Sequence, residues 1–172
     1  MLRRLGVIKR NQRGFTLIEV LVATAITGFI GVGITMAASQ VLNINALSIN
    51  HITVLKQVEN ATYWINRDAQ MAQIVQPSGG SGFPLNLSWV EWDNTMHQVS
   101  YTLESSKLYR SYSVNGGQPS QTVVAEHINT NAGMTNCQFA GGVFTFKVTA
   151  SVSGFRPATE TRMAQMIPRP AP

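Results

Sequence analysis

The chain has 172 residues, of which 44% are apolar and only 12% are charged. That charged share is about half of what a soluble domain usually carries, which indicates that an apolar segment is concentrated somewhere in the chain. The formal net charge is +5, but five of the 13 basic residues lie within the first fourteen positions, which leaves eight basic against eight acidic residues from Phe15 onward. A body without net charge lacks the basic stripe that phosphate contacts require, so the sequence argues against nucleic-acid binding.

The first fourteen residues form a short basic segment that ends in Gly14. It contains no acid, and its cations are Arg3, Arg4, Lys9, Arg10 and Arg13. A cationic segment ahead of an apolar run retains the N-terminus in the cytoplasm. The charge distribution therefore predicts a single-pass cytoplasmic-membrane protein whose C-terminal body lies outside the cytoplasm.

The run from Phe15 to Ala38 contains one charge, Glu19, and no proline. It exceeds the roughly 20 apolar residues that a helix needs to cross a bilayer. Gly28, Gly31 and Gly33 permit close approach of neighbouring helices, although glycine is also common in membrane helices generally. We expect residues 15–38 to be a transmembrane helix, with these glycines as candidate packing positions.

An amphipathic pattern continues from residue 39 to residue 76 without glycine or proline. Apolar residues recur at spacings of three and four, at Leu47, Val54, Val58, Ala61, Ile65, Ala72 and Val75. Pro77 then marks the end of the helix. The pattern predicts one helix from about Thr16 to Val75, whose second part presents a single apolar stripe that another element must cover.

The segment 77–84 (PSGGSGFP) predicts a loop, and beyond it the hydrophobic period changes from helical spacing to two. We expect a β-rich domain over residues 85–165, with strands around Leu87 and Trp89 and over residues 97–103, 107–112, 123–125 and 143–152. Residues 166–172 are expected to be a flexible tail. A sheet packed on the helix stripe buries one face of each element, which gives an α+β fold with an antiparallel meander.

The segment Arg13–Ala23 (RGFTLIEVLVA) resembles the class III signal of type IV pilins and type II secretion pseudopilins. It has a basic leader, a small residue, Phe, a short apolar step, Glu and then an apolar helix. The resemblance implies that residues 1–14 are a leader which a prepilin peptidase removes between Gly14 and Phe15. It also implies that the same enzyme N-methylates Phe15. Gly14 has no side chain, so a peptidase can approach the bond closely.

Glu19 is an acid in the first turns of an apolar helix. The helix dipole favours a carboxylate there, but an acid within lipid is expensive and needs a partner. The family's partner is the Phe15 amine of the adjacent subunit, so the resemblance implies that Glu19 sets the axial register between subunits. The alternatives are a tolerated acid on an ordinary signal anchor and a secretory signal peptide cut near Ala37-Ala38-Ser39.

A second, looser resemblance lies late in the helix. The segment Trp64–Ala72 (WINRDAQMA), with the runs 99–103 and 107–110 that follow, resembles J-type minor pseudopilins and related minor pilins. Arg67 and Asp68 are either a solvated pair at the helix end or residues that anchor helix to sheet, and we favour anchoring. This resemblance favours a minor subunit at or near a filament tip.

Residues that could support catalysis or metal binding do not cluster in the sequence. The three histidines are far apart, no calcium-binding group of acids occurs, and the single cysteine, Cys137, excludes an intramolecular disulfide and is expected to be a small buried hydrophobe. The tryptophans Trp64, Trp89 and Trp92 are expected in the helix–sheet core rather than in a surface patch. We expect no catalytic residue, no metal and no cofactor.

The sequence thus predicts a structural subunit of a type II secretion or type IV pilus-like filament rather than an enzyme. Its expected partners are a prepilin peptidase, other pilins, the inner-membrane assembly platform and, before assembly, membrane lipid. The choice among secretion, pilus and DNA-uptake systems stays open. The competing interpretation is a signal-anchored extracytoplasmic binding module or enzyme that never polymerises.

Overall fold

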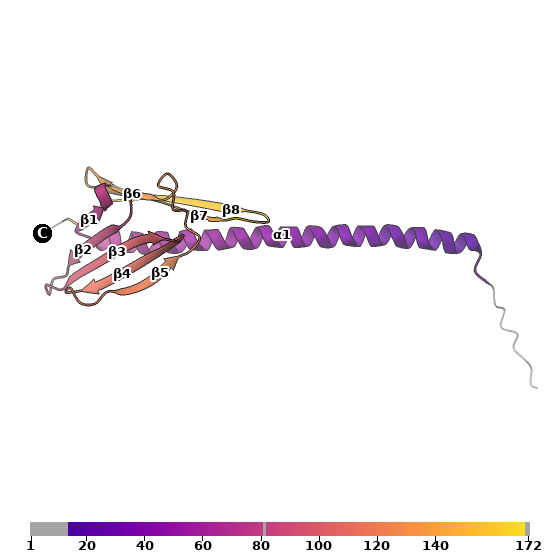
Figure 1. Cartoon of the computed structure of the whole chain (residues 1–172), viewed down its shortest axis with the longest axis horizontal. Helices are drawn as coiled ribbons and strands as arrows, with labels where there is room; N and C mark the ends of the chain where they lie inside the picture. The colour runs from indigo at the N-terminus through magenta and orange to yellow at the C-terminus, as the bar shows by residue number, and fades with distance from the viewer. Residues whose placement is uncertain (1–13, 81, 171–172) are drawn as a thin grey trace, which may run out of the picture. The chain divides into compact units, whose positions relative to one another are not determined.

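The computed structural model describes residues 14–80 and 82–170 of the chain (Figure 1). The predicted leader up to residue 13 and the last two residues of the predicted tail lie outside the described residues. The chain divides into two compact units, of which the first ends at Asn43 and the second begins at Ile44. Each unit is described by itself below.

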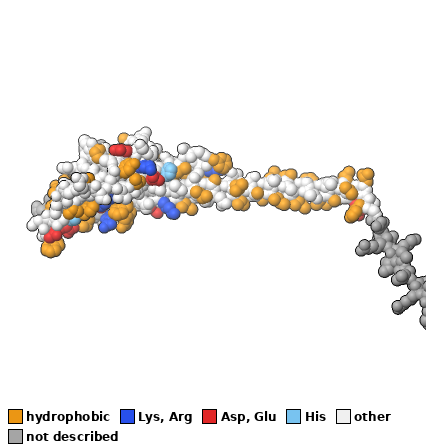
Figure 2. All heavy atoms as spheres, turned by 60° about the horizontal axis from the view of Figure 1, so that its bottom comes forward, with side chains coloured by type: hydrophobic (Ala, Val, Ile, Leu, Met, Phe, Trp, Pro, Cys, Tyr) orange, Lys and Arg blue, Asp and Glu red, His pale blue; other side chains and the backbone are white. Residues whose placement is uncertain are grey.

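The helix α1 (Leu17–Met71) is the only α-helix of the described residues and belongs to both units. In the first unit its side chains are exposed on all sides, and Figure 2 shows apolar side chains along this segment. In the second unit one stripe becomes buried, at Val54, Val58, Ala61, Ile65, Asp68 and Ala69. Leu47, which the spacing places on the stripe, stays 50% exposed.

The helix ends at Met71, not near Val75 as the sequence pattern predicts. The amide of Ala72 donates the last helical bond to the carbonyl of Asp68, at 3.0 Å, and the amide of Gln73 donates to Ser88 at 2.9 Å. Strand β1 (Ile74–Pro77) follows and pairs with β2. The prediction is wrong because the burial pattern does not distinguish the two structures here. Ala72, directly after the helix, and Val75 on β1 are both buried, and their three-residue spacing would bury them on a helix face as well.

The chain beyond β1 forms two antiparallel sheets. The first has the order β1-β2-β3-β4-β5 and contains β2 (Leu85–Val90), β3 (Met96–Glu104), β4 (Lys107–Val114) and β5 (Ser120–Ala125). The second has the order β6-β7-β8 and contains β6 (Asn136–Ala140), β7 (Val143–Val152) and β8 (Ala158–Met166). The predicted α+β class with antiparallel pairing is confirmed, but the strands form two sheets rather than one meander.

Several predicted boundaries shift in the structure. The predicted loop 77–84 begins inside β1 and contains the short 3₁₀ helix η1 (Ser78–Gly80). The β-rich region extends to Met166, which is the first residue of the predicted tail, and Pro168 within that tail is buried.

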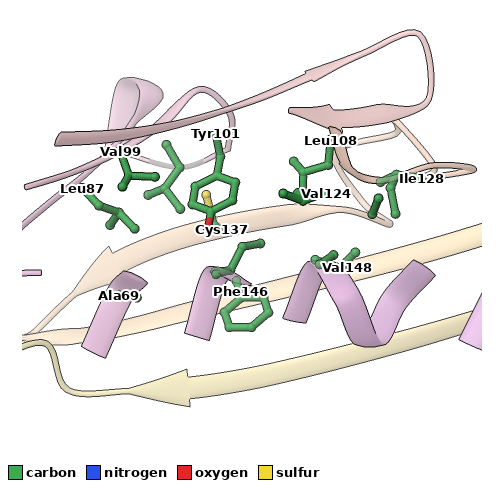
Figure 3. Packing of buried hydrophobic residues seen from close by; sticks show 14 of the residues in the cluster. Ala69, Leu87, Val99, Tyr101, Leu108, Val124, Ile128, Cys137, Phe146 and Val148 are labelled. Atoms are coloured by element: carbon green, nitrogen blue, oxygen red, sulfur yellow. The ribbon is translucent and has the colours of Figure 1, made fainter. Parts of the chain in front are cut away.

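The core lies between the stripe of α1 and the inner faces of the sheets. Figure 3 shows side chains of both sheets, among them Leu87, Tyr101 and Phe146, gathered beside Ala69 of the helix. Their burial follows strand alternation, since Leu85, Leu87 and Trp89 are buried while the residues between them are more exposed. Both sheets therefore cover the stripe that the sequence leaves uncovered.

Cys137 on β6 connects the second sheet to the loop before β2. The amide of Gly82 donates to the Cys137 carbonyl at 2.6 Å, and the thiol donates to the Gly82 carbonyl at 3.0 Å. The side chain of Cys137 is buried, as expected for a small hydrophobe, and this burial raises the pKa of its thiol to about 12.

Candidate functional site

The proposed cleavage bond lies in exposed, non-helical chain directly before α1. Gly14, Phe15 and Thr16 have no regular structure, and Phe15 is 85% exposed. A Cβ added at Gly14 would meet no atom within 4 Å. The bond between Gly14 and Phe15 is therefore open to an enzyme, and no helical hydrogen bond has to break before it is cut.

Thr16 and Glu19 cap the start of α1 reciprocally. The Glu19 amide donates to Thr16 Oγ1 at 3.3 Å, while the Thr16 amide and hydroxyl donate to Glu19 Oε2 at 3.1 and 3.0 Å. This is a capping box, which satisfies amides that a helix start leaves without partners. The Glu19 carboxylate is thus held close to Phe15 on its own chain. The predicted site did not include Thr16, although the spacing Thr-x-x-Glu signals its role.

The polar side chains of the apolar helix bond back to its own backbone. The hydroxyls of Thr24, Thr27, Thr35 and Ser39 donate to carbonyls three or four residues earlier, at 2.8 to 3.0 Å. A hydroxyl satisfied in this way can enter hydrocarbon without a further partner. Among the described residues α1 is the one helix long and apolar enough to cross a membrane.

The candidate packing glycines lie on the exposed helix of the first unit. A Cβ added at Gly28, Gly31 or Gly33 would meet no atom within 4 Å. No described residue packs on them, so their role in contacts between subunits stays a prediction.

The start of the chain matches a known family. Residues 9–35 match the family described as the prokaryotic N-terminal methylation motif. The chain carries a prepilin methylation motif. The matched range includes Gly14, Phe15 and Glu19 and ends before the sheets, and it supports a type IV pilin-like precursor that a prepilin peptidase processes. The methylation motif and the long apolar helix together fit a single-pass membrane anchor.

No curated protein and no solved structure matches the chain.

A second cluster of functional interest lies in the sheet unit, around Asp68. Asp68 is 3% exposed, and its carboxylate accepts hydrogen bonds from Arg110 Nε at 2.6 Å, from Arg110 Nη2 at 2.9 Å and from the Tyr101 hydroxyl. Burial, and then the adjacent carboxylate, raises the pKa of Tyr101 well above its ordinary value, so this hydroxyl stays a donor. Asp68 on α1 is therefore hydrogen-bonded to both β3, through Tyr101, and β4, through Arg110.

The Arg110 guanidinium lies over two aromatic rings. Its carbon is 4.9 Å from the Trp64 ring centre and 5.1 Å from that of Tyr112. Planar stacking and a bidentate carboxylate are both geometries that suit arginine and not lysine. The bond to Asp68 spans 42 residues, and no local spacing in the sequence could have signalled it.

Arg67, the other residue of the predicted anchoring pair, takes no part in this cluster of ion pairs. It is exposed, and its guanidinium lies 5.4 Å from the ring centre of Trp64 on its own helix. The three tryptophans also separate: Trp89 is buried, Trp64 is partly buried and Trp92 is 92% exposed. The expectation that all three lie in the core is therefore wrong for Trp92.

Proposed function

We propose that this chain is a structural, non-enzymatic minor subunit of a type II secretion or type IV pilus-like filament. The observation that carries the proposal is the methylation motif, with Glu19 in the first turn of an apolar helix and an exposed Gly14–Phe15 bond just before it. The sheet unit would lie outside the cytoplasm, in the periplasm or at the cell surface.

The chemistry proceeds in three steps on these residues. A prepilin peptidase cleaves after Gly14 and removes the five leader cations. The same enzyme then transfers one methyl group from a sulfonium methyl donor to the deprotonated Phe15 amine; the donor leaves as a neutral thioether, and the resulting secondary amine is cationic. As the helix leaves the lipid through the assembly platform, Glu19 pairs with the Phe15 amine of the neighbouring subunit. That pairing replaces a costly unpaired acid in an apolar environment and so fixes the register.

The minor-subunit part of the proposal rests on two sequence features. The segment Trp64–Ala72 resembles J-type minor pseudopilins, and one cysteine cannot close the C-terminal disulfide loop that many pilins have. A few copies at or near the filament tip, in contact with other minor subunits, would suit these features.

Mass spectrometry of the mature N-terminus tests the class of protein. We expect a chain that begins at Phe15 with one added methyl group, and a Gly14→Val control that retains its leader. An intact leader in the unmodified chain, or a cut before Gln40, would contradict the filament role and favour an anchored or secreted module.

The role of Glu19 has its own test. We expect Glu19→Ala to be cleaved and methylated normally but to be absent from filaments, whereas Thr24→Ala on the same exposed helix is incorporated. Unchanged incorporation of Glu19→Ala would refute the register role and leave processing of the chain unaffected.

A further inference from the structure

Two turns at opposite ends of the sheet unit present its most exposed aromatic rings. Trp92, in the β2–β3 turn, is 92% exposed, and Phe155, in the β7–β8 turn, is 72% exposed, more than any other described aromatic residue after Asn43. Exposed aromatic rings are common anchors of protein interfaces. The Trp92 turn also adjoins the exposed pair Val90 and Met96, which face each other across β2 and β3.

The two turns carry opposite charge. Glu91 and Asp93 flank Trp92, whereas Arg156 follows Phe155 and lies 5.6 Å from its ring centre. Within the described residues none of these three charged side chains takes part in an ion pair, in contrast to Asp68 and Arg110. One turn is therefore an acidic aromatic surface and the other a basic aromatic surface.

Both turns are held in fixed conformations. In the acidic turn the Glu91 amide donates to Thr95 at 3.0 Å, and Asp93 accepts a bond from the Thr95 amide at 2.9 Å. In the basic turn the Asn50 side-chain amide donates to the carbonyls of Phe155 and Arg156, at 3.3 and 2.8 Å. A preorganised turn loses little conformational entropy when it binds.

The contacts with α1 set the separation of the two turns. The basic turn is fixed to Asn50, while the amide of Val90, just before the acidic turn, donates to Gln73 beyond the helix end at 2.9 Å. The helix from residue 50 to Met71 rises about 30 Å at 1.5 Å per residue. Figure 1 shows the β2–β3 and β7–β8 turns at opposite ends of the sheets.

We propose that the Glu91–Trp92–Asp93 turn of one copy docks onto the Phe155–Arg156 turn of the next copy of this chain. Two different complementary surfaces at opposite ends produce a head-to-tail contact, which is the kind of contact that an open filament uses when its rotation does not close into a ring. Arg156 would lie against the Trp92 ring with the two acids beside it. This inference rests on the filament role proposed above and adds to it that the few copies of this chain contact one another directly.

A disulfide experiment on cells that express the full chain tests the contact. The variant combines Asn94→Cys and Ser153→Cys, exposed positions of the two turns that leave both aromatic rings in place, in a Cys137→Ala background, which removes the native thiol. After mild oxidation we expect a reducible ladder of dimers and larger species on a non-reducing gel, and only monomers for each single cysteine variant. A dimer from Asn94→Cys alone would show a symmetric contact and overturn the proposal.

The charges provide a second measurement. In the two-cysteine chain, Arg156→Glu should lower the cross-linked yield several-fold, and Glu91→Arg in the same chain should restore it. Equal yields with and without Arg156→Glu would overturn the electrostatic pairing.

The same samples separate failure of the contact from failure of the filament role. A methylated chain that is present in the filament fraction but gives no ladder overturns the contact alone. A chain that is absent from the filament fraction, without methylated Phe15, overturns the filament role and the contact together.

Discussion

Arg110 on β4 binds Asp68 on α1 through both Nε and Nη2, at 2.6 and 2.9 Å, so that a strand and the helix it covers are joined by a fork of charged hydrogen bonds. The carboxylate is nearly inaccessible, and it also accepts a hydrogen bond from the Tyr101 hydroxyl. A buried acid with three donors from two strands fixes the rotation of the helix about its axis, because only one face of the helix places Asp68 within their reach.

Asp68→Asn should destabilise the sheet unit strongly. It leaves the Arg110 charge without its counter-charge in a largely buried site, and breaking such a pair costs about 3–5 kcal/mol. Denaturant unfolding of the full chain in detergent micelles measures the change. The matched control is Arg67→Ala, one residue away and exposed, which should cost under about 1 kcal/mol. Equal losses for the two variants would contradict the anchoring role.

Tyr101 should make stability fall with pH in the alkaline range. Its pKa is raised in the folded chain, so above about pH 10 the unfolded chain loses this proton while the folded chain keeps it. The free energy of unfolding then decreases by about 1.4 kcal/mol per pH unit from this group. Tyr101→Phe should remove that part of the slope, whereas Tyr63→Phe, at a 60% exposed position, should not. A slope unchanged by Tyr101→Phe would show that another group titrates.

Thr16→Val should loosen the first turn of α1. The variant keeps the shape of the side chain but removes the hydroxyl that accepts from the Glu19 amide, and a lost cap costs about 1 kcal/mol. Amide hydrogen exchange in micelles should therefore be about fivefold faster at Glu19 and Val20, whose amides bond to Thr16, by the usual relation of free energy to equilibrium constant. Thr16→Ser retains the hydroxyl and should exchange at the original rate. Faster exchange in both variants would mean that the methyl group, not the cap, stabilises the turn.

Cys137 should resist alkylation in the folded protein. Because its pKa is about 12, the thiolate fraction at pH 8 is on the order of one in ten thousand, and the side chain is only 2% exposed. Iodoacetamide should label it rapidly only after denaturation. Ser120→Cys, at an exposed position in a Cys137→Ala background, should be labelled without denaturant. Rapid labelling of native Cys137 would show that the contact with Gly82 opens.

Features set by neighbouring residues are the ones that the sequence predicts well. The alternation from Val143 to Val152 predicts a strand with the bounds that β7 has, and the run 107–112 lies within β4. The methylation motif is likewise local, so the order of residue types along the chain is enough to name its members. The apolar stripe predicts the buried helix face because helical spacing alone decides which residues share that face.

Features set by distant pairing are the ones that the sequence leaves open. Strand β8 has no alternation of apolar and polar residues, and it is a strand because nine of its residues pair with β7. The helix ends at Met71 because Gln73 bonds to Ser88 on another strand. The alternation over residues 107–112 does not indicate that Arg110 binds Asp68, because the two residues meet only when β4 packs on α1.

The back-bonded hydroxyls of α1 have an energetic consequence for the proposed filament. A helix whose polar side chains are satisfied by its own backbone presents an almost purely hydrocarbon surface, so moving it from lipid tails to a bundle of pilin helices exchanges one apolar surrounding for another. The hydrophobic effect then provides little net driving force for that transfer. The free energy of transfer is instead set by how well the helix surfaces fit at Gly28, Gly31 and Gly33 and by the charge of Glu19. Such a subunit could be added to a filament and returned to the membrane with a small difference in free energy, which would make polymerisation reversible at this segment.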